Sequence, residues 1–196
     1  MQGVLLDSKN ERGGFPFLLV LALIFVLFTL IFNNVFVLVK VSGDSMNETL
    51  SSGDVLLVNK LKDVSRGDVV VVNHPSRGMV IKRVIAVGGD EIRCDALDDG
   101  DGKIYIKYKG TDEFVALDEP YLSVTNPDIY QQKVEEGCLF ILGDNRSNST
   151  DSSSYGAIKS EYVVGVVSQK VIDNKGVITK ALGWTFKLVE FFGCEE

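Results

Sequence analysis

The sequence predicts a mostly β protein with one N-terminal transmembrane helix, and three observations support this prediction. One uninterrupted apolar run lies near the N-terminus, short runs rich in valine and isoleucine follow it, and glycine, aspartate and asparagine separate those runs. The length of 196 residues suits one compact domain with a small appendage. No long amphipathic helical pattern lies between the β-rich runs, which disfavours alternating strands and helices. We therefore expect curved or barrel-like antiparallel sheets.

The N-terminal apolar run, Phe15–Phe32, is long enough to cross a membrane. It carries no charged side chain, and a helix of this length spans about 27 Å, close to the roughly 30 Å core of a bilayer. A cleaved signal peptide is the alternative, but its apolar core is usually about 7–15 residues long and precedes a small-x-small site. A buried core helix is disfavoured because the run is apolar on every face. We predict a retained anchor over residues 15–34.

Basic residues beside the anchor indicate its orientation. Lys9 and Arg12 precede the apolar run and Lys40 follows it, and the positive-inside rule counts mainly lysine and arginine. This favours a cytoplasmic N-terminal segment over residues 1–14. The acidic remainder, residues 35–196, is then expected to form an extracytoplasmic β domain.

Seven runs in the β domain have the composition of strands. They are VFVLVKV, DVLLVNK, DVVVVN, MVIKRVIAV, KIYIKY, CLFILGD and YVVGVVSQKV. An acidic stretch rich in glycine, aspartate and proline, at about residues 93–136, looks like an insertion between two better patterned halves. The aromatic segment 180–193 is expected to form a short helix, on the domain or at the membrane surface.

Composition excludes several functional classes. The net charge of −7 and the pI near 4.8 argue against nucleic acid, because phosphate binding needs clustered basic residues. His74 is the sole histidine, so a multi-histidine metal site is impossible, and Cys94, Cys138 and Cys194 lie too far apart for a zinc ribbon or a disulfide framework. We expect no metal and no cofactor. His74 precedes proline in a turn, where a histidine is more often solvated than catalytic.

The run MVIKRVIAV offers a lysine that could act as a base. A buried ammonium is poorly solvated, so its pKa falls, and the neutral amine can then deprotonate a serine. The alternative is a lysine whose stem packs on apolar neighbours while its ammonium reaches water; from the pattern alone this is the commoner case. The strand period of two gives two expected faces: Lys82 with Val80, Val84 and Ala86, and Arg83 with Met79, Ile81, Ile85 and Val87.

Ser45 is the candidate serine, because it follows a predicted strand and a Gly-Asp turn. Gly43 lets the backbone approach a substrate closely, and the Ser45 amide could point at a developing oxyanion. The same composition is also common in ordinary turns. A third segment, Leu142–Gly156, is polar and turn-rich. It is either a solvated loop or a support that holds a buried amine and orients a strand through an ion pair.

Together these segments resemble the type I signal peptidases, which are membrane-anchored serine proteases with a serine and lysine dyad. Residues 43–54, GDSMNETLSSGD, resemble the serine box of that family, with Glu48 where proline is usual. Residues 66–72, RGDVVVV, and 82–90, KRVIAVGGD, resemble the next two boxes, and 143–156 resembles the last. The resemblance covers the anchor and about residues 41–90 and 139–165, but not the insertion.

The resemblance implies roles for individual residues. Ser45 matches the nucleophile, Lys82 the general base, and Ser149 the serine that hydrogen-bonds the lysine amine. Arg83 and Asp144 resemble an ion pair that joins two boxes. The remaining supporting residues implied in this way are Gly43, Arg146 and Asp151.

Two departures from the family pattern lead to expectations about the geometry of the site. Ser153 stands where an arginine is usual, which is expected to remove a partner of Asp151 and loosen the site. Gly43 stands where some members place a serine that donates to the oxyanion, so the oxyanion hole would rest mainly on the Ser45 amide.

The resemblance implies an endopeptidase that removes signal peptides from secreted preproteins at small-x-small sites. Its implied partners are preprotein signal peptides, membrane lipid and the secretion translocon. Relatives in eukaryotes and archaea use histidine, so Lys82 indicates a bacterial cell-membrane enzyme. One alternative is a catalytically inactive, membrane-tethered homologue that acts as a chaperone in secretion or pilus assembly. The self-cleaving repressors also use a serine and lysine dyad, but they carry a DNA-binding domain in place of a membrane segment.

Overall fold

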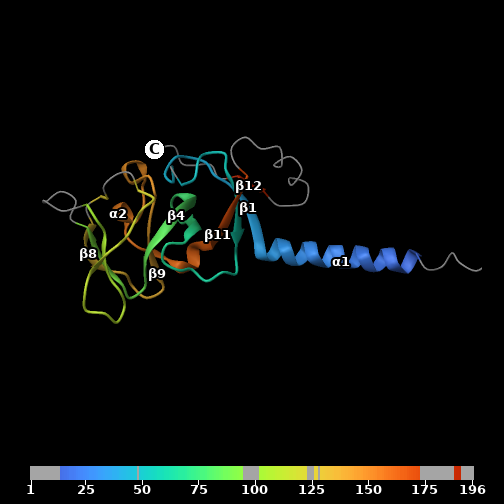
Figure 1. The fold of residues 1–196 in the computed structure, drawn as a ribbon, viewed down its shortest axis with the longest axis horizontal. Coiled ribbons are helices and arrows are strands. Elements are labelled where there is room, and N and C mark those ends of the chain that lie inside the picture. The colour runs from blue at the N-terminus through green and yellow to red at the C-terminus, as the bar shows by residue number, and fades with distance from the viewer. Residues whose placement is uncertain are drawn as a thin grey trace, which may run out of the picture. The chain divides into compact units, whose positions relative to one another are not determined.

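The computed structural model of the protein describes residues 14–47, 49–94, 102–122, 126–127, 129–172 and 188–190. The chain divides into two units, an N-terminal one that ends at Val35 and a β domain that begins at Phe36. Figure 1 shows the helix and the strands of these units coloured along the chain.

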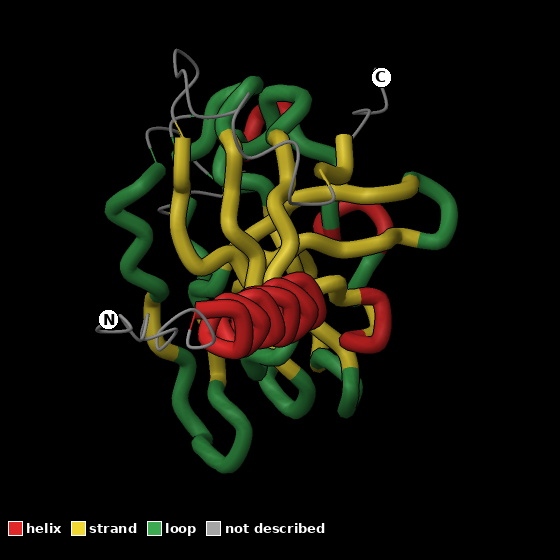
Figure 2. The backbone as a smooth tube through the Cα atoms, turned by 90° about the vertical axis from the view of Figure 1, so that its right-hand side faces the viewer, coloured by secondary structure: helices red, strands yellow, loops and turns green. Residues whose placement is uncertain are grey.

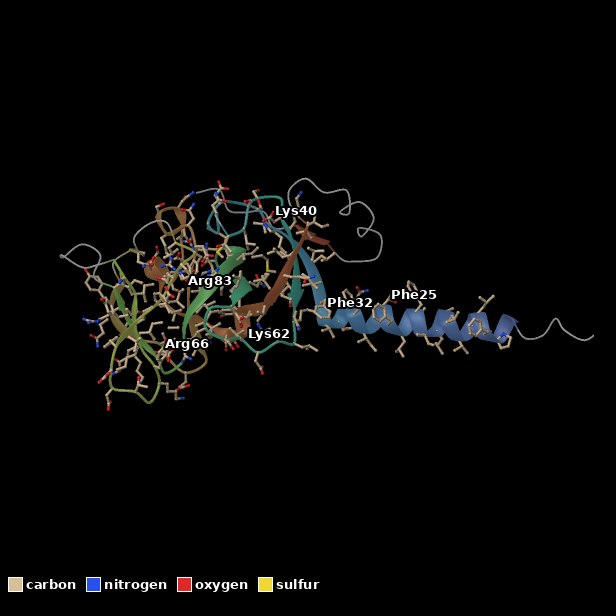
Figure 3. All side chains as sticks on the ribbon, viewed as in Figure 1. Phe25, Phe32, Lys40, Lys62, Arg66 and Arg83 are labelled. Carbon is tan, nitrogen blue, oxygen red and sulfur yellow. The ribbon has the colours of Figure 1, made fainter. Side chains whose placement is uncertain are left out.

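The N-terminal unit contains one long helix, α1, over Gly14–Val35. Its stretch Pro16–Val35 has a mean hydropathy of 2.6, and by length and composition it can cross a membrane. Its two polar side chains with described bonds, Thr29 and Asn34, donate to backbone carbonyls within the same helix. Such internal bonds allow polar groups to sit in lipid. The phenylalanines labelled on the helix in Figure 3 project from it.

The β domain is built on an eight-stranded sheet with the order β10-β9-β4-β3-β11-β2-β1-β12. Neighbouring strands are antiparallel except β1 and β12, which are parallel. Among the described residues the two outer strands do not pair with each other, so the sheet is open. The prediction of a mostly β fold is confirmed, but the sheet is not closed into a barrel, and Figure 2 shows its strands bending along their length. The strands are β1 Phe36–Lys40, β2 Val55–Asn59, β3 Val69–His74, β4 Gly78–Val87, β9 Cys138–Leu142, β10 Ile158–Lys159, β11 Val163–Ile172 and β12 Leu188–Glu190.

The stretch that the sequence marks as an insertion forms a second sheet with the order β7-β6-β5-β8. Its isoleucines pack with Phe140 of β9 in one buried cluster, so the two sheets share a core. The second sheet is therefore part of the domain that holds the candidate site. Its strands are β5 Glu91–Cys94, β6 Tyr105–Lys107, β7 Val115–Ala116 and β8 Ile129–Lys133.

The two faces of the main sheet carry separate buried clusters. On β3, Val71 belongs to one cluster, whereas Val70 and Val72 belong to the other. This is the alternation that a strand with both faces buried requires.

Strand β4 departs from the expected period of two. Val80 and Val84 pack in the same cluster, as expected for the Lys82 face, but Val87 packs there too. The cause is a register shift between Val84 and Ala86 against β9, since a bulge moves the following side chains to the opposite face. The expected grouping of Ala86 with Lys82 and of Val87 with Arg83 is therefore wrong.

All seven runs predicted as strands contain strands. The expected C-terminal helix is wrong for residues 188–190, which form β12 because the free edge of β1 supplies backbone partners; the rest of that segment lies outside the described residues. The polar segment 142–156 contains two short helices, η1 Arg146–Asn148 and α2 Ser152–Tyr155. A third, η2, covers Ser160–Tyr162.

Candidate active site

Lys82 lies in the middle of β4 and is almost completely buried, with 3% of its surface exposed. Burial lowers the pKa of its ammonium to about 8; the negative charge of Asp151 acts in the opposite direction, and the positive charge of Arg77 adds to the lowering. The alternative of a lysine whose ammonium reaches water does not apply. At pH 8 about half of such lysines carry an amine that can accept a proton.

Ser45 lies in a tight turn between β1 and β2. The amide of Asn47 donates to the carbonyl of Asp44 at 3.0 Å, and the amide of Leu50 donates to the carbonyl of Met46 at 2.8 Å. Gly43 has φ +86°, a left-handed conformation that favours glycine, and a β-carbon there would meet nothing within 4 Å. The backbone in front of Ser45 is therefore open to an incoming chain. Glu48, the departure from the serine box, lies outside the described residues.

Gly143 connects the lysine strand to the serine turn. Arg83 of β4 is paired with Leu142 of β9, so continuing this antiparallel register by one residue sets Lys82 opposite Gly143. A β-carbon on Gly143 would collide with the Ser149 hydroxyl and with the Ser45 carbonyl. The nucleophile turn, the lysine strand and Ser149 therefore converge on a position where only glycine fits.

Asn145 also binds the turn of Ser45. Its backbone amide donates to the Ser45 carbonyl and its side-chain amide donates to the Asp44 carbonyl, both at 3.0 Å. The Asp44 carbonyl belongs to the peptide group whose N–H is the Ser45 amide. Sequence reasoning gave Asn145 no role, because its partner is 101 residues away in the chain.

Asp151 organises the segment that carries Ser149. Its Oδ2 accepts from the Ser149 hydroxyl at 2.5 Å and from the Gly143 amide at 2.9 Å. Its Oδ1 accepts from the Ser153 hydroxyl at 2.8 Å and from the Ser153 amide at 3.2 Å. The arginine usual at position 153 is absent as expected, but Asp151 keeps donors there, because it is the N-cap of α2 and Ser153 supplies two of them.

Since the Ser149 hydroxyl donates its proton to Asp151, its oxygen can only accept from any third group. A lysine amine is a donor of that kind. The arrangement is compatible with the role that the resemblance implies for Ser149.

Arg83 and Asp144 form the expected ion pair between two boxes. The contacts are bidentate at 2.8 and 2.6 Å, and Arg83 also donates to the Gly67 carbonyl at 2.9 Å. Although burial lowers the pKa of Arg83, the hydrogen bond and charge of Asp144 outweigh it and raise the pKa above its ordinary value. The pair fixes the start of the 143–156 segment against β4. Figure 3 labels Arg83 on β4.

Arg66, also labelled in Figure 3, makes a second bidentate pair, with Asp90, at 2.7 Å for both contacts. Asp90 also accepts from the backbone amides of Val87 and Lys109. This pair joins the turn before β3 to the turn after β4 and to the second sheet. The sequence contained both residues in family boxes but no signal that they are partners.

Arg146 is paired with a residue that sequence reasoning missed. Its guanidinium contacts the Glu119 carboxylate at 2.5 and 3.3 Å, with 0% of the Arg146 side chain and 6% of the Glu119 side chain exposed. Glu119 belongs to the stretch that matches no family box. No local pattern distinguishes it from the other acidic residues of that stretch.

Comparison with known proteins shows the family of this chain. The family described as "Signal peptidase, peptidase S26" matches residues 15–172. The chain belongs to this family. The match includes helix α1 from its second residue, both sheets except strand β12, and every candidate site residue named above.

Individual relatives are similar over most of their length. Signal peptidase I V of Bacillus subtilis is 35% identical over 153 residues, which is 69% of this chain and 86% of that protein. Signal peptidase I of Bacillus caldolyticus is 30% identical over 180 residues, or 82% of this chain and 91% of that protein. Among solved structures, a signal peptidase I from Enterococcus faecalis has 29% identity and a TM-score of 0.45, covering 55% of this chain and 98% of that one.

Proposed function

We propose that the protein is a membrane-bound serine endopeptidase that removes signal peptides from preproteins, with Ser45 as nucleophile and Lys82 as general base. The observation that carries this proposal is the burial of Lys82, which is 3% exposed and has a pKa of about 8. Lys82 lies in register with Gly143, which is packed closely against Ser45 and Ser149. The similarity to proteins named signal peptidase I supports the substrate class.

The first chemical step is acylation. The neutral amine of Lys82 takes the proton of the Ser45 hydroxyl, and the serine oxygen attacks the scissile carbonyl carbon. The carbonyl oxygen becomes an oxyanion that accepts from the backbone N–H of Ser45. The Lys82 ammonium then gives its proton to the leaving amine, and the peptide bond breaks.

The second step is hydrolysis of the acyl-enzyme. Lys82, again neutral, removes a proton from a water molecule that attacks the ester carbonyl. The tetrahedral intermediate collapses as the proton returns to the Ser45 oxygen, which releases the new carboxyl end of the signal peptide. No cofactor is needed, because the serine and the lysine together supply nucleophile, base and acid.

The residue that follows Ser45 belongs to the buried core of the β domain. Met46 is buried directly after the nucleophile and packs in one cluster with Val41 and Ile81. The restriction to small residues in a small-x-small pattern is the part of this proposal that rests on the family alone.

Helix α1 serves as the anchor in this proposal, with the N-terminal segment in the cytoplasm and the β domain on the extracytoplasmic face. Enzyme and signal peptide are then confined to one membrane, which raises their effective concentration. Membrane lipid surrounds the helix, and the secretion translocon delivers the preprotein.

The test uses the full chain in detergent and a purified preprotein. S45A and K82A are expected to abolish the release of the mature N-terminus while circular dichroism shows an intact fold. S76A and K159A are the matched controls, since both residues are exposed, and they are expected to cleave at the wild-type rate. Cleavage by S45A or K82A would overturn the dyad.

A fluorophosphonate probe separates the enzyme from an inactive chaperone. The probe is expected to label the wild type at Ser45 and to leave S45A unlabelled. A folded wild type that neither reacts with the probe nor cleaves would favour the chaperone.

A further inference from the structure

Glu119 makes a deeply buried ion pair between the second-sheet region and the candidate site. It lies between β7 and β8, in the stretch that matches none of the family boxes, and binds Arg146 of η1. Both side chains are nearly inaccessible to solvent. A buried ion pair is weak evidence for a stabilising role, because desolvation offsets most of the attraction. The effect of the pair on the position of neighbouring groups is stronger evidence for its role.

The Glu119 carboxylate accepts hydrogen bonds from two residues of its own region in addition to those from Arg146. The Tyr121 hydroxyl donates to its Oε1 at 2.7 Å, and the Asn126 side chain donates to its Oε2 at 3.1 Å. Asn126 is itself tied to the Gly102 carbonyl at 2.8 Å. Each carboxylate oxygen therefore has one donor from its own region and one from Arg146.

Arg146 transmits this position to the candidate site. Its Nε donates to the carbonyl of Gly143 at 3.0 Å, and Gly143 is the residue that touches Ser149 and Ser45. The neighbouring Tyr121 contacts the same segment indirectly. Its ring lies 4.1 Å from the guanidinium of Arg83, and Arg83 forms an ion pair with Asp144. Glu119 and Tyr121 thus hold both arginines that fix residues 143–144.

We propose that Glu119 is a positioning residue for peptide cleavage: through Arg146 it sets the place of the Gly143 peptide, and so the separation of the lysine strand from the serine turn. Arg146 belongs to a family box, but the group that orients it comes from outside the boxes. This inference rests on the proposed roles of Ser45 and Lys82. It adds that the second sheet supplies part of the catalytic geometry.

A positioning role predicts a selective kinetic defect. A displacement of about 1 Å in a catalytic site can cost about a hundredfold in rate. The Glu119 side chain is only 6% exposed, so it has almost no surface with which to bind substrate. In E119Q the amide keeps the shape of the side chain but removes its charge. We expect kcat to fall about 10- to 100-fold with KM changed less than about threefold.

The experiment measures kcat and KM for preprotein cleavage by the full chain in detergent, at a temperature where melting curves show each variant folded. E136Q is the matched control in the same region, since Glu136 pairs with Lys109 in an exposed ion pair, and it is expected to match the wild type. If E119Q does not fold, E119Q/R146Q replaces it, because this variant leaves no unpaired buried charge; it is expected to be folded and equally slow.

The outcomes separate the two proposals. A folded E119Q, or E119Q/R146Q, with a kcat within twofold of the wild type would overturn the positioning role and leave Glu119 a structural residue. Equal losses in E136Q would also overturn it, since the effect would then not be specific. A wild type that does not cleave while S45A and K82A behave identically to it would instead overturn the proposed dyad.

Discussion

The side chain of Asn145 donates a 3.0 Å hydrogen bond to the carbonyl of Asp44. That carbonyl and the Ser45 N–H belong to the same peptide group, so the bond fixes the direction in which the N–H points. The Asn145 backbone amide also donates to the Ser45 carbonyl. If the Ser45 N–H is the oxyanion donor, as proposed, Asn145 aligns that donor without touching substrate.

The variant N145A tests this alignment. It removes the side-chain bond and keeps the backbone bond, so we expect kcat to fall about 10- to 100-fold, somewhat less than the loss of a direct oxyanion donor. KM is expected to stay within threefold. The exposed Asn73 provides the control variant N73A, and a kcat for N145A equal to that of N73A would show that the alignment is unimportant.

The lowered pKa of Lys82 predicts a rise of activity with pH. Only the neutral amine can accept the serine proton, and its fraction grows as pH rises through about 8. We expect kcat/KM for preprotein cleavage to rise about tenfold per pH unit below this midpoint and to level off above it. A profile that is flat between pH 6 and 9 would contradict the role of Lys82 as base.

Burying a lysine costs stability, so K82M is expected to inactivate the enzyme and stabilise the fold. The folded-state pKa of about 8 lies below the ordinary 10.5, so below pH 8 the folded protein must charge a buried amine. We expect K82M to gain about 1–3 kcal/mol in unfolding free energy at pH 7. As pH rises from 8 to 10.5 the wild type recovers stability, because only its unfolded state then still binds the proton.

Chemical unfolding of the wild type and K82M at pH 7 and pH 10 measures this difference. The difference in unfolding free energy between K82M and the wild type should be smaller at pH 10 than at pH 7. An advantage that is absent at pH 7, or that grows with pH, would mean that Lys82 is not held in an unfavourable environment.

Replacing Ser153 by arginine tests how Asp151 acts on Lys82. The negative charge of Asp151 raises the pKa of Lys82, and Ser153 donates to Asp151 without a charge of its own. In S153R a positive charge would oppose that effect, so we expect the midpoint of the pH profile to fall by about 0.5–1 unit.

S154R is the matched control for S153R. It adds the same charge one residue further along α2, on another side of the helix, and is expected to shift the midpoint less. An unchanged or raised midpoint in S153R would show that the Asp151 charge has little influence on the base.

The fold of the main sheet was largely predictable because its strands have both faces buried. Runs such as DVVVVN must be apolar at nearly every position to supply two clusters. The strands of the second sheet were harder to predict: β7 has two residues, and β8, IYQQK, has three exposed side chains. The isoleucines of the second sheet pack against Phe140 of β9, which is distant in the sequence. No local sequence pattern therefore predicts these strands.

The strand pattern placed Lys82 on an apolar face but by itself favoured an ammonium that reaches water, and it gave no sign of the bulge at Val84–Ala86. The partners of Asn145 and Arg146 lie 101 and 27 residues away, so sequence spacing could not pair them. Ser153 shows the converse: an expected loss of an ionic partner is compensated by a local helix cap, which only the backbone geometry reveals.

The titration of the Lys82 side chain tests the proposed mechanism most directly. NMR spectra of the full chain in micelles, with lysines labelled at Cε, assign the Lys82 signal by its loss in K82M. We expect this signal to titrate near pH 8, well below the exposed lysines. A Lys82 that titrates at pH 10 or above would contradict a neutral amine as the base for Ser45.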